Sequence, residues 1–515
     1  MPMRRSVHAE RSTLMTEGPI ARQLIAFALP LFLGNLFQQL YNTADSLIVG
    51  NFLGSEALAA VSSSSNLIQL MIGFFNGLAV GAGVVISRYY GARDIPRVQK
   101  AIHTMLAGGV IAGALLTALG VTLTPILLRM MGTPEAVLPL SVAYFRTYFY
   151  GAMAFVLYNI CMGILQAVGD SRHPLYYLIV SSVVNVTLDL LFIGVFHWGV
   201  ASAAAATAIS QLVSAMLSLY RLMHSDRDYR VNLRKIRINP GALREILKNG
   251  IPSGFANCII AIANVVIQSN INVFGAAAMA GCGAAARIDG FAFLPITCFN
   301  MALTTFVGQN LGAQRYDRVR RGVRIGVMTA VIIAQTIGLV NFILSPHLIA
   351  LFDKSPEVIR YGMIHERTMT AFYCLLAYSH TMAAVFRGAG KSTVAMLGMA
   401  VCWCVVRVPY VTIATRIYPH LIAVSSAYPV TWTLSSIIFT CTISNRTGCT
   451  DTAMQGHKCI AADAGHCALR CGFFYVRLPE FDKRAAICYH TIRKFPHAGK
   501  RIPSAAYIRR RGIQG

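Results

Sequence analysis

Two aspartates stand inside long apolar stretches of this 515-residue chain, where a charged side chain is costly and is therefore a candidate for function. Asp45 lies about 21 residues into the first predicted membrane span, roughly 30 Å along a helix that rises about 1.5 Å per residue. Asp189 lies about 14 residues into the fifth predicted span. Because both spans are predicted to run outward, we expect the two carboxyl groups at a similar depth, in the outer half of the membrane.

Polar side chains accompany both aspartates at helical spacing. Gln38 and Tyr41 precede Asp45 on the same helix face, and Asn185 lies one turn before Asp189. Two neighbouring carboxyl groups in an apolar setting can share one proton, because two negative charges repel strongly there. The oxygen atoms of the same side chains could instead ligate a hard cation such as Na⁺.

Each aspartate also has a structural interpretation. Asp45 could reach the outer water interface, and Asp189 could hydrogen-bond Asn185 and so pin two helices together. The sequence leaves these alternatives open, although an ionisable residue within a span favours a functional role.

The composition indicates a membrane protein. Hydrophobic residues make up 55% of the chain and charged residues 13%, against roughly 25% charged residues in a typical soluble domain. The mean hydropathy is +0.56, and apolar runs are long enough to cross a hydrocarbon core about 30 Å thick. We therefore predict an all-α integral membrane protein with about twelve spans. Their approximate cores are 24–52, 57–87, 99–128, 136–168, 175–196, 199–222, 251–274, 277–307, 323–351, 358–386, 393–416 and 421–443.

The net charge of +25 comes from Lys and Arg residues that gather in loops between the apolar runs. The basic loops follow the even-numbered spans, and the longest of them extends from Arg221 to Lys248. Because basic loops stay in the cytoplasm, both termini are predicted to be cytoplasmic. The charge therefore follows from membrane topology, and no nucleic-acid partner is expected.

The two halves of the chain repeat each other. Gly91 and Gly312 lie in similar turns, Gly54 and Gly275 are separated by the same offset, and Pro252 follows Pro30 at nearly that offset. Six spans in each half is an even number, so both halves keep the same orientation, and transporters built this way hold their substrate between the halves. The predicted parts are an N-terminal segment 1–22, an N-lobe 23–222, a basic linker 223–249, a C-lobe 250–444 and a tail 445–515.

Several stretches carry a resemblance to a known family. They are Met15-Thr-Glu-Gly-Pro-Ile, Ala28-Leu-Pro-Leu-Phe-Leu-Gly-Asn-Leu-Phe-Gln-Gln-Leu-Tyr-Asn-Thr-Ala-Asp45, and the paired turns Leu165-Gln-Ala-Val-Gly-Asp and Phe386-Arg-Gly-Ala-Gly. From about residue 15 to Phe439 the chain resembles the bacterial multidrug and toxic compound extrusion (MATE) exporters, most closely the branch called DinF-like. The resemblance implies two pseudo-symmetric six-helix lobes around a central cavity, in a monomer of the bacterial inner membrane. It also implies efflux of cationic or amphipathic small molecules, driven by inward flow of H⁺ or Na⁺.

The resemblance also implies site residues. Gln38, Tyr41, Asn159 and Thr207 match the polar partners of an N-lobe proton site whose acids lie in spans one and five. Some relatives that use sodium carry acids in the seventh and tenth spans. Here we expect no acid inside those two spans, which favours coupling in the N-lobe and leaves H⁺ and Na⁺ both open.

The C-lobe offers candidates for a substrate cavity. The seventh predicted span carries a polar stripe without an acid, at helical spacing. The stripe consists of Asn257, Asn264, Gln268 and Asn272. Arg287 and Arg407 are further candidates, although they could also form structural ion pairs with Asp289. Arg287 and Asp289 are two residues apart and so lie on different faces of a helix.

Other functions are less well supported by the sequence. Gly388–Ser392 lacks the frame of a phosphate-binding loop, so ATP drive is not expected. No ligand or nucleophile pattern lies at membrane depth, so neither an enzyme nor a bound metal or cofactor is predicted. A lipid flippase of the same broader superfamily is the alternative function, but the paired acids argue against a site for an anionic headgroup.

The chain beyond Phe439 does not continue the apolar pattern. It is polar and basic, and its cysteines and histidines lack Cys-x-x-Cys and His-x₃₋₅-His spacing, which disfavours zinc. We interpret it as a frameshifted, disordered tail that alters the last turn of the twelfth span. Met15 is a possible alternative start.

Overall fold

The computed structural model describes residues 14–130, 135 and 137–453, which are almost entirely helical and include no strand. The described residues up to Thr442 belong to one compact unit. Of the second unit, only residues 443–453 are described, as the end of the last helix.

The helices fall into two sets, here called the N half (residues 14–223) and the C half (residues 240–442). The N half contains α1 (Ile20–Gly91), α2 (Ile95–Met130), α3 (Leu138–Tyr150), α4 (Ala152–Ala167), α5 (Arg172–Asp189), the π-helix η1 (Leu190–Val195) and α6 (Ala201–Met223). The short 3₁₀-helix η2 (Leu233–Lys235) lies between the halves in sequence. The C half contains α7 (Pro240–Asn272), α8 (Ala276–Gly312), α9 (Tyr316–Ala350), α10 (Pro356–Thr370), α11 (Tyr373–Gly388), α12 (Ser392–Ala400), the π-helix η3 (Val401–Val406), α13 (Arg407–Ile417), α14 (Leu421–Ser425) and the start of α15 (Ala427–Ala453).

The number of membrane spans agrees with the sequence-based prediction. Ten helical segments among the described residues are long and apolar enough to cross a bilayer. Two further pairs, α3 with α4 and α10 with α11, qualify if each is one span bent by 47° and 54° respectively. The predicted all-α membrane fold with about twelve spans is therefore confirmed.

In each half, one glycine separates the first membrane span from the second. Gly54 interrupts α1 with φ of 85°, and Gly275 precedes α8 with φ of 91°. Only glycine adopts this region of φ without a steric penalty, so both positions reverse the chain between spans. Gly54 and Gly275 are as far apart in sequence as Gly91 and Gly312. Since Gly54 and Gly275 also share the same φ region, the two halves repeat each other in backbone conformation as well as in sequence.

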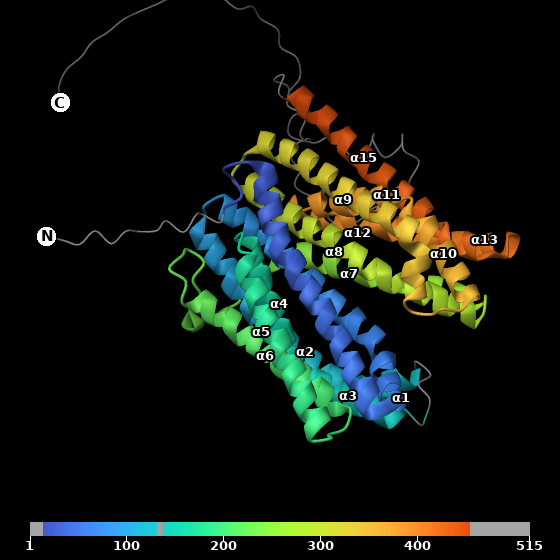
Figure 1. Cartoon of the computed structure of the whole chain (residues 1–515). Helices are drawn as coiled ribbons and strands as arrows, with labels where there is room; N and C mark the ends of the chain where they lie inside the picture. The colour runs from blue at the N-terminus through green and yellow to red at the C-terminus, as the bar shows by residue number, and fades with distance from the viewer. Residues whose placement is uncertain (1–13, 131–134, 136, 454–515) are drawn as a thin grey trace, which may run out of the picture. The chain divides into compact units, whose positions relative to one another are not determined.

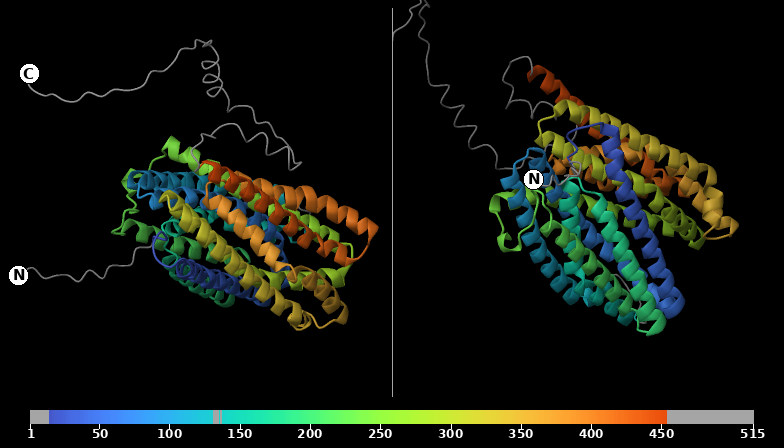
Figure 2. Two further views of the ribbon diagram at one scale, coloured as in Figure 1. Left: turned by 90° about the horizontal axis from the view of Figure 1, so that it is seen from above. Right: turned by 60° about the vertical axis from the view of Figure 1, so that its left-hand side comes forward.

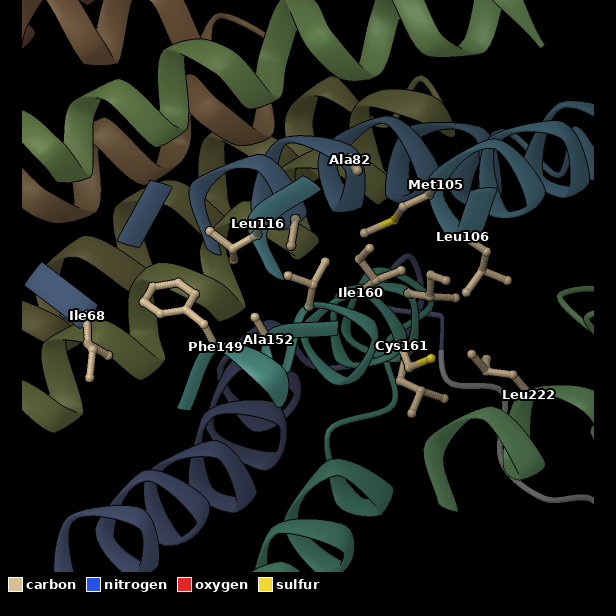
Figure 3. Packing of buried hydrophobic residues seen from close by; sticks show 14 of the residues in the cluster. Ile68, Ala82, Met105, Leu106, Leu116, Phe149, Ala152, Ile160, Cys161 and Leu222 are labelled. Atoms are coloured by element: carbon tan, nitrogen blue, oxygen red, sulfur yellow. The ribbon is translucent and has the colours of Figure 1, made fainter. Parts of the chain in front are cut away.

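Each half forms its own bundle, as Figure 1 shows for α2 to α6 in blue to green and α8 to α13 in yellow to orange; Figure 2 shows the same grouping from two other directions. In the N half, Met105, Leu106 and Leu116 of α2 pack with Phe149 and Ile160 in one buried cluster (Figure 3). The opposite side of α2 exposes further large apolar residues. Helices that are apolar on all sides suit a lipid environment, where outward-facing apolar surface has no cost.

The two halves touch through pairs of glycines on α1 and α7. Gly77 and Gly81 are one helical turn apart on α1, and so are Gly250 and Gly254 on α7. A Cβ added at Gly77 would lie 2.4 Å from the backbone of Gly254, and one at Gly81 would lie 2.3 Å from that of Gly250. Small residues with this spacing let membrane helices approach closely. We call the end of the helices marked by Gly91 and Gly312 the Gly91 end; the glycine contacts lie toward it along α1.

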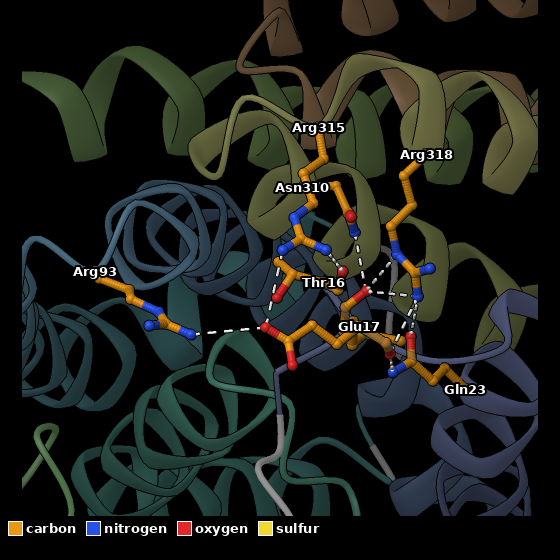
Figure 4. A network of polar contacts seen from close by, with 8 residues as sticks. Thr16, Glu17, Gln23, Arg93, Asn310, Arg315 and Arg318 are labelled. Atoms are coloured by element: carbon orange, nitrogen blue, oxygen red, sulfur yellow. Dashed lines mark hydrogen bonds and ion pairs between the residues drawn. The ribbon is translucent and has the colours of Figure 1, made fainter.

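A short segment ahead of α1 joins the halves at the Gly91 end. Residues 15–17, here called the N-terminal strap, lie against the turn between α8 and α9 (Figure 4). The Glu17 carboxylate forms salt bridges with arginines of both halves. Its Oε1 lies 3.7 Å from Nη2 of Arg93 in the N half and 3.8 Å from Nη2 of Arg315 in the C half. Arg318 donates to two strap carbonyls and, at 2.7 Å, to Gln23 Oε1. The strap and Gln23 thus supply oxygen acceptors to two C-half arginines, Arg315 and Arg318.

Two predicted boundaries differ from the observed ones. The linker 223–249 was expected to precede the seventh span, but α7 already begins at Pro240. Asn239 accepts the N–H of Ala242 at 3.1 Å, and proline follows it at the first helical position, a combination that starts helices. At the other end α15 continues to Ala453. The predicted disordered tail lies, from residue 454 on, outside the described residues.

Candidate functional site

The two intramembrane aspartates of the N half lie next to each other. Asp45 comes from the second half of the first span, Ile20–Gly54, in α1, and Asp189 is the last residue of α5, where the chain passes into the π-helix η1. Their carboxyl groups are within hydrogen-bonding reach of each other. Asp189 is fully buried and Asp45 is half-buried. A π-helical turn widens the helix locally and is frequent at functional sites.

Three of the four carboxyl oxygens of this pair have no donor among the described residues. Both carboxyl oxygens of Asp189 and Oδ1 of Asp45 are buried without a hydrogen-bond partner among the described residues. Buried polar atoms in native proteins are almost always partnered, because an unpartnered one costs about 1–3 kcal/mol. A proton or another cation between the two carboxylates would satisfy them together.

The polar residues predicted to surround this pair reach it to different degrees. Tyr41 lies within hydrogen-bonding reach of Gln38 and has electrostatic contact with both aspartates. Asn185 donates to Thr207 Oγ1 at 3.4 Å, and its own Oδ1 is buried without a partner in the described part of the chain. Asn185 Oδ1 is therefore a further oxygen that could face a cation.

Asn159 does not reach the pair through any described contact. Its side-chain amide donates to the carbonyl of Phe155 in its own helix, at 2.8 Å. This bond is the common way for a polar side chain to satisfy itself inside an apolar helix. The resemblance-based assignment of Asn159 to the site therefore stays a prediction.

The sequence analysis missed two residues of this site. Gln211 lies within hydrogen-bonding reach of Tyr41, and its Oε1 is buried without a partner among the residues described. Tyr144, from α3, is buried and interacts electrostatically with both aspartates. Gln211 could have been found, since it follows Thr207 by one helical turn. Tyr144 gave no such signal, because α3 contains no acid that would mark it as part of a proton site.

The C half holds a second pair of acids, and one of them corrects the sequence analysis. We expected no acid inside the tenth span, but Glu366 lies in α10 and is fully buried. It interacts electrostatically with Asp289 of α8 and accepts a hydrogen bond from Asn341 at 3.2 Å. The expectation was wrong already in the sequence, since Glu366 lies within the predicted tenth span 358–386; in the bent span of α10 and α11 it faces inward with other polar residues. Neighbouring His365, for example, bonds Ser425 at 2.7 Å.

The predicted ion pairing of Asp289 with the C-half arginines is absent among the described residues. Asp289 instead accepts a hydrogen bond from the hydroxyl of Tyr373. Arg407 is fully buried and donates to Thr431 at 2.7 Å, and its guanidinium stacks 4.1 Å from the ring centre of Trp403. Arg287 is exposed. In place of the predicted carboxylate, the partners of Arg407 are a hydroxyl group and an aromatic ring. A guanidinium group binds well to both.

The polar stripe on α7 is exposed along its length. Asn257 donates across the halves to the carbonyl of Gly73, at 2.8 Å, and Gln268 donates to Asn272 at 2.9 Å. Asn264 is also exposed. Asn257 therefore joins the halves in this state, while a role of the stripe in binding substrate remains a prediction.

The family of the chain follows from comparison with known proteins. The family model MatE matches residues 30–191 and again residues 252–413, so two stretches of equal length, one in each half, match the same model. The chain belongs to the MatE family. The double match confirms the internal repeat of this MATE protein, and the helical fold agrees with a multi-span membrane transporter.

Curated relatives and solved structures of MATE proteins cover most of the chain. "Probable multidrug resistance protein YpnP" of Bacillus subtilis is 30% identical over 77% of this chain and 88% of its own length. An "FAD transporter" of Shewanella oneidensis is 26% identical over 67% of this chain and 77% of its own length. A solved structure described as the outward-facing conformation of a multidrug resistance MATE family transporter superposes with a TM-score of 0.80 at 24% identity, covering 86% of this chain and 99% of that one. The last comparison shows the fold.

Proposed function

We propose that this MATE protein is a secondary antiporter that exports cationic or amphipathic small molecules in exchange for H⁺ or Na⁺. The observation that carries the proposal is the buried pair Asp45 and Asp189, whose oxygens face each other without donors in the described part of the chain. A pair of carboxylates in an apolar setting gains most from taking up one positive charge, which makes it a place where a coupling cation binds and leaves.

Antiport requires that the cation and the cargo favour different states of the transporter. A cation on the pair removes the repulsion between Asp45 and Asp189 and lets the N half pack closely around them. Without the cation, the two charges favour a state in which water or a cationic cargo reaches them. A ligand shifts an equilibrium only by its difference in affinity for the two states, and this arrangement supplies such a difference.

The contacts between the halves support alternating access. Gly77 and Gly81 on α1 pack against α7, and the strap residue Glu17 joins Arg93 to Arg315. These contacts close the Gly91 end, which we propose is the cytoplasmic one. Export would then require them to open in the inward-facing state. The bilayer that we propose is the bacterial inner membrane, with a monomeric protein and cytoplasmic termini.

The cargo class rests on charge. Relatives are named for multidrug resistance, and one is named an FAD transporter, so cargo differs within the family. Because the ionisable groups paired at the candidate site, Asp45 and Asp189, are acids, we favour a cationic or amphipathic cargo over an anionic one. A lipid flippase would need free cations at membrane depth, whereas the Arg407 guanidinium donates to Thr431 and stacks on Trp403, with only Nη1 left without a partner among the described residues. That alternative is not favoured.

The test is efflux of a cationic dye, such as ethidium, into inverted membrane vesicles that contain the full chain. A pH gradient imposed without Na⁺ should drive dye uptake if H⁺ is the coupling ion, and nigericin should stop it. A Na⁺ gradient at equal pH on both sides should drive uptake if Na⁺ is the coupling ion. Dye movement that is insensitive to both gradients would exclude coupled antiport.

A further inference from the structure

Two crevices open at the Gly91 end of this protein, and each is lined by basic side chains. The first, of about 350 Å³, lies between the end of α1 and the start of α7 and includes Arg88, Arg97 and Lys248. The second, of about 400 Å³, lies at the α8–α9 turn and includes Arg315 and Arg318. We call them the first and the second crevice.

The chain itself supplies oxygens to the second crevice. Arg315 donates to the carbonyl of Thr16 at 2.7 Å, and Arg318 donates to the carbonyls of Met15 and Glu17 (Figure 4). The Glu17 carboxylate lies 3.8 Å from Arg315. These cations are therefore compensated by the N-terminal strap.

The first crevice has no corresponding compensation. Within the described part of the chain, neither the Arg88 guanidinium nor the Lys248 ammonium has a hydrogen bond or an ion pair. Arg97 is partly compensated, since it pairs with Asp94 at 3.3 Å. The one acid that lines the crevice among the described residues, Glu245, accepts a hydrogen bond from the Tyr89 hydroxyl at 2.6 Å. Two cations thus face the crevice uncompensated.

The first crevice also lies where a membrane surface would be. Arg88 stands shortly before Gly91, at the end of a candidate membrane span. Basic pockets between helices at this level bind acidic lipid headgroups, and phosphate oxygens accept charge-assisted hydrogen bonds from Arg and Lys.

We propose that the first crevice binds the phosphate headgroup of an anionic phospholipid, such as phosphatidylglycerol. Arg88 and Arg97 come from the N half, whereas Lys248 and Asn249 come from the C half. A bound headgroup therefore joins the halves at the Gly91 end, as the strap does on the other side. The lipid would stabilise the state in which this end is closed.

The test compares lipid binding to the full chain, purified in a neutral detergent, by native mass spectrometry and by thermal unfolding. Phosphatidylglycerol, phosphatidylcholine and inorganic phosphate are added separately. The variant R88Q/K248Q removes the two uncompensated charges. The variant R234Q/K235Q removes two exposed charges from the loop at the same end and is the matched control. The variant R88K/K248R keeps both charges and tests whether the crevice still folds.

We expect phosphatidylglycerol to bind more tightly than phosphatidylcholine and to raise the unfolding temperature of the wild type. R88Q/K248Q should weaken phosphatidylglycerol binding by roughly 10–30-fold, since each basic residue near a membrane surface contributes about 1 kcal/mol. R88K/K248R should stay within about threefold of the wild type, as should R234Q/K235Q. Equal losses in R88Q/K248Q and R234Q/K235Q would overturn the proposal in favour of diffuse attraction. Equal protection by inorganic phosphate would overturn the lipid as the ligand.

Discussion

The two halves of this protein place different chemistry at corresponding positions of the same fold. The two family matches begin 222 residues apart and the paired glycines lie 221 residues apart, so Asp45 corresponds to Ile267 or its neighbour Val266, and Asp189 corresponds to Val411 or its neighbour Tyr410. Ile267 and Val411 are buried in one apolar cluster of the C half. The positions that hold two acids in one half therefore hold no acid in the other, where Ile267, Val411 and Tyr410 belong to apolar packing. A repeated scaffold needs a polar site in only one copy, because the other copy can serve as its rigid counterpart.

The acids of the C half lie elsewhere and differ in their partners. Asp289 receives the hydroxyl of Tyr373, and Glu366 receives the amide of Asn341 at Oε1, whereas its Oε2 is buried without a partner among the described residues. A carboxyl group with a fixed donor is already partly satisfied and gains less from a mobile cation. The N-half pair lacks such donors among the described residues, which is why we propose it as the coupling site.

The largest effect is expected from neutralising the N-half pair. Asp45→Asn and Asp189→Asn should each lower gradient-driven dye efflux by roughly 100-fold, near the upper end of coupling free energies between two sites. An amide cannot take up the positive charge of the coupling ion. The variants should unfold at an equal or higher temperature than the wild type, because an unpartnered buried carboxylate costs about 1–3 kcal/mol.

Glu366→Gln is the matched control in the C half. Glutamine keeps the acceptor for Asn341, so efflux should fall by less than about threefold. If Glu366→Gln stopped efflux while Asp189→Asn did not, the assignment of the two halves would have to be reversed. Membrane levels of each variant, measured by immunoblot, separate lost coupling from lost protein.

The next effect concerns the contact between the halves. Gly81→Leu would place side-chain atoms where the backbone of Gly250 lies 2.3 Å from an added Cβ, so α1 and α7 must separate. We expect the free energy of unfolding to fall by about 1–3 kcal/mol, as for overpacked cores, with a loss of transport. Thermal unfolding in detergent measures this.

Gly108→Leu provides the comparison for that variant. Gly108 is also helical, but an added Cβ there meets nothing within 4 Å. Both substitutions remove a helical glycine and gain similar helix propensity. Equal unfolding temperatures for Gly81→Leu and Gly108→Leu would show that α1 and α7 do not approach as closely as described.

A smaller effect distinguishes two arginines at corresponding positions. Arg318 follows Arg97 by the same offset that separates Gly312 from Gly91. Arg318 binds the strap carbonyls and Gln23, whereas Arg97 pairs with Asp94 of its own half.

Arg318→Ala should lower the free energy of unfolding by about 1.5–3 kcal/mol, the range for charged hydrogen bonds. Arg97→Ala should lower it by less than about 1 kcal/mol, because its ion pair is exposed. The opposite order in thermal unfolding would argue that the strap does not hold the halves together.

The smallest effect lies in the turns that join α4 to α5 and α11 to α12, where Asp170 corresponds to Lys391. Burial acts to raise the pKa of Asp170, but the His173 ring at 2.6 Å and the backbone N–H groups of His173 and Arg172 outweigh it and lower that pKa. The ionised carboxylate therefore stabilises the folded state above an unfolded pKa of about 3.9. This stabilisation is lost as pH falls through the lowered folded pKa.

Asp170→Asn tests that pH dependence. At pH 7 the variant should be less stable than the wild type by about 1 kcal/mol, and the difference should shrink as the pH is lowered below about 4. Thermal unfolding between pH 7 and pH 3 measures it. A difference that is constant over this range would indicate that the Asp170 charge contributes nothing to folding.

The sequence by itself determined the spans, the repeat and the two N-half acids. An apolar run long enough to cross a bilayer is expected to form a helix. In lipid every backbone N–H and C=O group must be hydrogen-bonded within the protein, and a helix achieves this within one segment. An acid inside such a run stands out against its neighbours, as Asp45 and Asp189 do. Constant offsets between glycines and prolines, such as Gly54 and Gly275, also need no structure to be seen.

Only the tertiary structure decided which polar groups meet. Gln211 reaches Tyr41 and Tyr144 interacts with Asp45 from helices far away in sequence, and Glu366 meets Asn341 of another helix. The strap acts on a turn far along the chain, since Met15 and Gln309 are 294 residues apart. Helical periodicity fixes which residues share a face of one helix, but not which face of another helix lies opposite. That choice depends on close packing between helices, which the pattern of one helix does not contain.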